Sequence, residues 1–87
     1  MDRFIAVHTL THPTEENFQA MVEKVTKAVP RGFVWKQTYC DFVSHKFFCE
    51  WEAPGKEVLE QTFKDINFSF EAVYVVKLHN VDKKKFV

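Results

Sequence analysis

The sequence predicts a small α+β sandwich in which one four-stranded antiparallel sheet carries two helices on one face. Two segments with helical spacing of apolar residues lie among segments with the alternation typical of strands, in the order β-α-β-β-α-β. Each predicted helix has one apolar stripe, so both helices need the same sheet to cover it. The chain has 87 residues, of which 46% are hydrophobic. This size and composition predict one folded domain spanning residues 1–87.

The first half of the chain supplies a strand and a helix. Residues 3–10 alternate and are rich in branched and aromatic side chains, which is typical of a strand. Thr14 is the expected N-cap of the helix, because the two glutamates after it suit the positive end of a helix dipole. Residues 30–32 (Pro-Arg-Gly) end the apolar periodicity. We therefore predict a helix over residues 14–29.

The second half supplies three strands and a helix. Residues 33–41 and 47–53 read as a hairpin, and residues 70–79 as the last strand. Between them, a Pro-Gly pair opens a helix with the apolar residues Val58, Leu59, Phe63 and Ile66. Right-handed crossovers then interleave the two halves into the strand order 4-1-3-2, with both helices on one face. This is the ferredoxin-like arrangement, and it leaves the other sheet face open.

The register of the hairpin decides which residues line the open face. Pairing Asp41 with Phe47 sets Lys36 opposite Glu52 and keeps both Glu50 and Glu52 out of the core, where unpaired carboxylates are costly. In the first strand we expect Ile5 and Val7 to point toward the helices. The predicted open face then holds Phe4, His8, Lys36, Thr38, Cys40, Phe48, Glu50, Tyr74 and Val76.

A candidate site follows from this predicted face. His8, Glu50 and Cys40 would converge there, with Thr38 and Tyr74 beside them. An imidazole, a carboxylate and a thiol together suit a divalent transition metal. The same set suits a small polar ligand, with His8 as an acid or base. The alternative is a purely structural hydrogen bond between His8 and Glu50 at a dimer interface.

Charge and composition narrow the class of partner. Lys plus Arg and Asp plus Glu number 12 each, so no net charge draws the chain toward nucleic acid or an anionic membrane. No apolar segment is long enough to span a bilayer, and no secretory signal is recognised, so we expect a cytoplasmic protein. A half-apolar open face on so small a domain favours a homo-oligomer, a dimer or larger.

Two motifs resemble a known family. Residues 35–39 (Trp-Lys-Gln-Thr-Tyr) and 49–54 (Cys-Glu-Trp-Glu-Ala-Pro) are similar to a family of small bacterial and archaeal proteins, mostly of unknown function. Its members show a Trp-x-x-Ser/Thr-Tyr strand and a Cys-x-aromatic-x-Ala-Pro strand end. Residues 3–9 and 70–74 resemble its first and last strands. The resemblance implies a ferredoxin-like fold and, because some members are described as nickel-binding, nickel as a ligand. Gln37 departs from the pattern, since some members carry His there.

Three functions remain open at this point. The first, which we predict, is a small homo-oligomeric binding protein that holds a divalent transition metal such as nickel on the open face. The second is a dimeric α/β-barrel protein that binds a small ligand between two sheets, or a cofactor-free monooxygenase-like enzyme built in that way. The third is a structural or interaction module whose open face only joins subunits. No catalytic residue is assigned, so enzymatic activity stays open.

Overall fold

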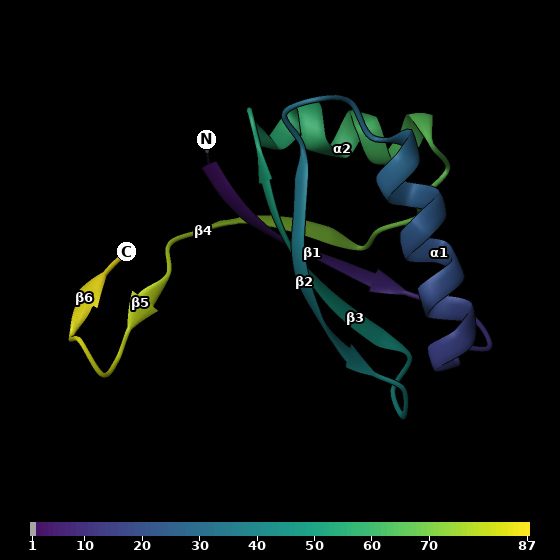
Figure 1. Ribbon diagram of the computed structural model, residues 1–87, viewed down its shortest axis with the longest axis horizontal. Helices are drawn as coiled ribbons and strands as arrows, with labels where there is room; N and C mark the ends of the chain where they lie inside the picture. Colours follow the sequence, from purple (N-terminus) through teal and green to yellow (C-terminus); the bar gives the residue numbers. More distant parts are fainter. Residues whose placement is uncertain (1) are drawn as a thin grey trace.

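The computed structural model describes residues 2–87 and has the predicted element order as far as β4, after which two short strands follow (Figure 1). Strands β1, β3 and β2 and the shorter β4 form one antiparallel sheet in the order β2-β3-β1-β4, which confirms the predicted 4-1-3-2. Both helices lie on one side of this sheet. The α+β sandwich with an open sheet face is therefore confirmed. The elements are β1 (Asp2–Thr9), α1 (Glu15–Ala28), β2 (Val34–Asp41), β3 (Lys46–Ala53), α2 (Lys56–Asp65) and β4 (Ala72–Val76).

The boundaries of α1 follow the predicted signals. The hydroxyl of Thr14 accepts a hydrogen bond from the backbone N–H of Asn17 at 3.0 Å, as an N-cap does. At the other end Val29 is the C-cap, and Gly32 follows with a φ of +95°, a left-handed conformation that glycine adopts without strain. Helix α2 begins after Gly55, which has no side chain to cap it.

The core lies between the sheet and the helices, and α2 contributes more to it than α1. Leu59 and Phe63 of α2 are fully buried, whereas Val25 is the one buried residue of α1. Neither helix is long and apolar enough to cross a membrane, as judged over residues 2–87. The buried side chains of the sheet in this core are Phe4, Ala6, Cys49, Trp51, Ala53 and Val73.

The predicted orientation of β1 is wrong. Phe4, Ala6 and His8 are fully buried on the helix side, and the alternate residues, which include Ile5 and Val7, face the open side. Both sets are largely apolar, so alternation alone does not distinguish them. The observed orientation keeps the charged Arg3 on the open face beside a carboxylate, whereas the predicted one would bury it beneath the helices.

The predicted register of β2 is also wrong, by one residue. Asp41 pairs with Lys46, not with Phe47, because its carboxylate accepts hydrogen bonds from the backbone N–H groups of Val43 and Ser44 at 3.1 and 3.0 Å and tightens the turn. A bulge between Trp35 and Gln37 then absorbs one residue. As a result Thr38 and Cys40 face the helix side, while Gln37 and Tyr39 face the open side.

The orientations predicted for β3 and β4 are confirmed. Cys49 and Trp51 are fully buried beneath the helices, so Glu50, which lies between them, faces the open side. Val73 is buried on the same side as Cys49, and Tyr74 is exposed on the open face.

The C-terminal segment differs from the prediction of one last strand over residues 70–79. Strand β4 ends at Val76, and β5 (His79–Asn80) and β6 (Lys85–Phe86) form a separate two-stranded sheet. We call residues 78–87 the arm. Figure 1 shows the arm standing away from the sandwich, on the side opposite to α1. Its exposed apolar residues are Leu78, Val81, Phe86 and Val87.

Candidate functional site

The predicted site residues do not form one cluster. His8, Thr38 and Cys40 lie on the helix side of the sheet, and Glu50 and Tyr74 lie on the open face. The predicted convergence of His8 with Glu50 is therefore wrong. Among residues 2–87, no three His, Cys, Asp or Glu side chains come together as a metal site requires. The nickel that the family resemblance implies thus finds no matching ligand set among the described residues of one chain.

His8 is a buried, neutral side chain. Its Nδ1 lies 2.7 Å from the backbone carbonyl oxygen of Ser69, which fixes Nδ1 as the donor. Its ring stacks on Phe68 at 4.0 Å and meets Phe63 edge-on at 5.3 Å. Burial lowers the pKa of His8, although the bond to Ser69 and the charge of Glu71 oppose the shift. His8 therefore ties β1 to the segment after α2, which is a structural role.

The two cysteines also lie on the helix side and remain unpaired. Cys40 is exposed and Cys49 is buried. Burial raises the pKa of the Cys49 thiol to about 12, so this thiol stays protonated and packs as a small apolar group. Burial also raises the pKa of Cys40, and the nearby charge of Glu15 adds to the shift. Neither thiol is activated as a nucleophile or a metal ligand.

A polar cluster occupies the centre of the open face instead. The carboxylate of Glu50 lies 3.2 Å from Nε of Arg3 and accepts a hydrogen bond from the side-chain amide of Gln37 at 2.9 Å. The side chains of Glu50 and Arg3 are only 14% and 26% exposed. A second ion pair, Lys36 with Glu52 at 3.8 Å, lies at the edge of the cluster. The sequence predicted this charge pair, but the residue directly opposite Glu52 is Val34, not Lys36.

Sequence reasoning identified Glu50 but missed Arg3 and Gln37. The signal that would have found Arg3 is its charge within the β1 strand. A cation on the helix side of the sheet would be buried without a partner, so Arg3 is expected on the open face. The orientation of Gln37 toward the open face depends on the register and the bulge in β2, which the alternation of residues does not reveal.

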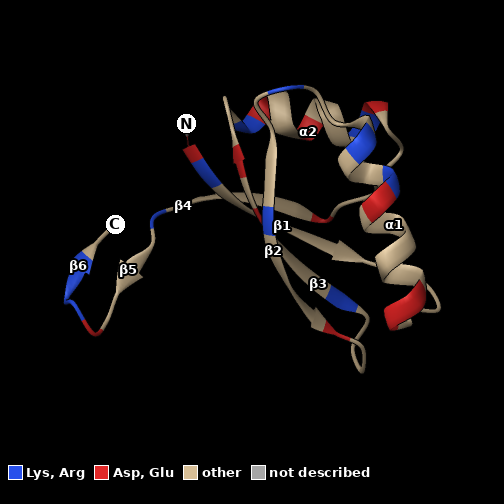
Figure 2. Ribbon diagram, in the orientation of Figure 1, with Lys and Arg blue, Asp and Glu red and all other residues tan. Residues whose placement is uncertain are grey.

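Exposed aromatic side chains surround the polar cluster. Tyr39, Phe48 and Tyr74 are 68%, 39% and 56% exposed. Figure 2 shows that basic and acidic segments are interspersed along the strands and helices. The open face therefore combines an electrically balanced polar centre with an apolar surround. By strand pairing it consists of Arg3, Ile5, Val7, Thr9, Val34, Gln37, Tyr39, Asp41, Lys46, Phe48, Glu50, Glu52, Ala72, Tyr74 and Val76, and Lys36 at the bulge joins it through Glu52.

Comparison with known proteins supports the fold. No protein-family description and no curated protein sequence matches this chain. Among solved structures, the crystal structure of SCO4226 from Streptomyces coelicolor A3(2) is similar, with a TM-score of 0.78 and 18% sequence identity. The similarity covers 90% of this chain and 99% of that one. The two chains share a fold.

Proposed function

We propose that this chain is a homodimeric binding protein, in which two open faces pack together and enclose a small organic ligand. The observation that carries the proposal is the largely buried pair of Arg3 and Glu50, joined by the exposed Gln37, on a helix-free sheet face with exposed aromatic residues. The proposal keeps the homo-oligomeric binding protein predicted from the sequence. It replaces the metal by an organic ligand, because the predicted metal ligands lie on opposite faces.

A second copy of the chain is a suitable partner for the open face. Exposed aromatic side chains such as Tyr39, Phe48 and Tyr74 are typical of interfaces, where their burial is favourable. A two-fold interface sets the same patch on both sides. The open face carries the cations Arg3 and Lys36 and the anions Glu50 and Glu52, at its centre and edge, so it does not repel a copy of itself.

The polar centre supports a ligand between the two sheets. Closing the faces would remove Arg3 and Glu50 from water, and such a desolvated pair is stable only when its remaining donors and acceptors are satisfied. Nε of Arg3 is buried and has no aligned hydrogen-bond acceptor among residues 2–87, although Glu50 lies close. A small molecule with oxygen acceptors would satisfy this guanidinium and Gln37, while the aromatic side chains enclose its apolar part. Because both cysteines are free, we place this function in the reducing cytoplasm.

The oligomeric state tests the first part of the proposal. We expect sedimentation equilibrium to give twice the chain mass of 10.3 kDa for the native protein and the single mass for Phe48→Asp. Val43→Asp is the matched control, because Val43 is 93% exposed in the β2–β3 turn, outside the open face. A monomeric native protein, or a dimeric Phe48→Asp, contradicts the proposal.

Native mass spectrometry of the purified dimer tests the ligand. We expect an additional small mass that is retained in Val43→Asp and lost in Arg3→Gln, since Arg3 supplies the charged donor. A dimer that carries no ligand and encloses no cavity between its sheets would favour the interaction module instead.

A further inference from the structure

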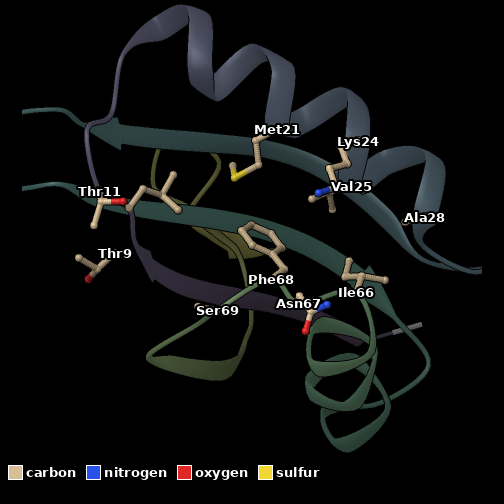
Figure 3. Close-up of a pocket in the computed structure, with 11 residues that line it drawn as sticks. Thr9, Thr11, Met21, Lys24, Val25, Ala28, Ile66, Asn67, Phe68 and Ser69 are labelled. Atoms are coloured by element: carbon tan, nitrogen blue, oxygen red, sulfur yellow. The ribbon is translucent and has the colours of Figure 1, made fainter.

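A cleft on the helix side of the sheet is not used by the proposed function. It lies between α1 and the segment that follows α2, and its volume is about 350 Å³. This volume falls at the lower end of the range of about 300–1,000 Å³ that small-molecule sites occupy. Figure 3 shows the ring of Phe68 between the two walls, below Met21 and Val25 of α1. The lining residues are Thr9, Leu10, Thr11, Met21, Lys24, Val25, Ala28, Ile66, Asn67, Phe68 and Ser69.

The cleft exists because the two helices bury different amounts of side chain. Helix α1 places only Val25 fully in the core, so it stands off from the segment after α2. The floor between them is held by two contacts: Phe68 stacks on His8, and His8 is hydrogen-bonded to the carbonyl oxygen of Ser69. Asn67, in a left-handed conformation with φ of 58°, ends the turn after α2 and brings this segment back beneath α1.

The lining has an apolar body and a single charge. Leu10, Met21, Val25, Ala28, Ile66 and Phe68 form the apolar part. Lys24 is the one charged residue among those that line the cleft, and no ion pair within residues 2–87 engages it. The hydroxyl of Thr11 and the amide of Asn67 are further hydrogen-bond donors at the rim. Donors without an acidic neighbour in the lining favour a negatively charged group on the ligand.

We propose that this cleft binds a small, largely apolar carboxylic acid, whose carboxylate pairs with Lys24 and whose body packs on Phe68 between α1 and the segment after α2. The site is independent of the proposed dimer, because the cleft and the open face lie on opposite sides of the sheet.

The experiment uses two dyes with the same apolar body. The first, 8-anilinonaphthalene-1-sulfonate, carries a sulfonate in place of the carboxylate, and the second, N-phenyl-1-naphthylamine, is uncharged. We expect fluorescence titration to show saturable binding of both dyes to the full-length native protein. Lys24→Gln should weaken the anionic dye by about threefold to fivefold, the effect of a partly exposed ion pair, and leave the neutral dye unchanged. Lys27→Gln, on the same helix but outside the cleft, is the matched control.

A second pair of variants tests the cleft itself. Ala28→Phe places a ring in the cleft and should weaken both dyes by about tenfold or more through steric exclusion. Ala20→Phe makes the same change at an exposed position of α1 outside the cleft and should leave both affinities unchanged. Circular dichroism and a thermal melt confirm that each variant is folded. Equal dye affinities for Ala28→Phe and Ala20→Phe, or for Lys24→Gln and Lys27→Gln, overturn the proposal whatever the oligomeric state.

Discussion

His8 shows how a single buried side chain can determine which face of a strand is covered. Its Nδ1 donates to the carbonyl oxygen of Ser69, and its ring fits between Phe68 and Phe63. The neutral form suits this site, because burial lowers the pKa of the imidazole. A histidine that the sequence marks as a candidate ligand is therefore a tertiary anchor.

We predict that stability falls as the pH drops below about 6.5, the ordinary pKa of histidine. Between that value and the lowered pKa of folded His8, the unfolded chain binds more protons, so acidification favours unfolding. In His8→Phe this dependence should largely disappear, while the free energy of unfolding at pH 7.5 decreases by about 1 kcal/mol with the lost hydrogen bond. Urea unfolding at pH 7.5 and 5.5 and fixed protein concentration measures both effects. An unchanged pH dependence in His8→Phe would contradict this role.

Measurements above pH 5 separate His8 from the acidic residues. Hydrogen bonds from Lys46 and Thr9 hold the pKa of Glu71 below its ordinary value, and turn hydrogen bonds do the same for Asp41. Because the folded pKa values of these carboxyl groups are lowered, their contribution to stability is lost only at more acidic pH.

At the scale of elements, the two helices begin in different ways. Thr14 caps α1 through its hydroxyl, whereas α2 starts after Gly55 with no side-chain cap. Gly55 has an extended φ of −173°, which any residue adopts, and a Cβ added there meets nothing within 4 Å. A capping side chain is therefore compatible with the start of α2.

We predict effects of opposite sign at the two caps. Thr14→Ala should lower the free energy of unfolding by about 1 kcal/mol, because the N–H of Asn17 loses its acceptor. Gly55→Ser should raise it by a few tenths of a kcal/mol by supplying an acceptor to α2. Urea unfolding of both variants measures the changes. A stabilised Thr14→Ala or a clearly destabilised Gly55→Ser would show that these caps do not act as the geometry indicates.

At the scale of the whole molecule, the arm is the feature that a single chain leaves without a packing surface. The radius of gyration of the chain, 13.4 Å, exceeds the value of about 12 Å expected for a compact domain of this length. The ring of Phe86 packs edge-on against His79 within the arm, at 4.8 Å, and is still 65% exposed. A second copy on the open face would give the apolar side chains of the arm a surface to cover.

We predict that the midpoint temperature of unfolding rises with protein concentration in the native protein, because the proposed dimer would couple folding to association. Phe86→Ser should lower this temperature at a given concentration. In the Phe48→Asp background the same substitution should change the free energy of unfolding by less than about 0.5 kcal/mol, as expected for an exposed side chain. Thermal melts over a hundredfold range of concentration test this, and a concentration-independent native midpoint would argue against the dimer.

The sequence by itself determined the order of the elements, the limits of α1 and the strand order of the sheet. These features depend on local signals, such as the cap at Thr14 and the single apolar stripe of each helix, and on the general handedness of crossovers. It also placed Glu50 on the open face, because burying the carboxylate beneath the helices would be costly, whereas its neighbours Cys49 and Trp51 are readily buried.

The tertiary structure decided which residues of β1 and β2 the helices cover, and hence which groups form the candidate site. Alternation tells which side chains share a face, but β1 offers two sets that are both largely apolar. Contacts distant in sequence select between them. The carbonyl oxygen of Ser69 accepts a hydrogen bond from Nδ1 of His8, and the carboxylate of Glu50 pairs with Arg3. In β2 the turn at Asp41 sets the register and a bulge absorbs the extra residue. Such contacts form only when the elements meet, and they brought Arg3, Gln37 and Glu50 together while separating His8 from Glu50.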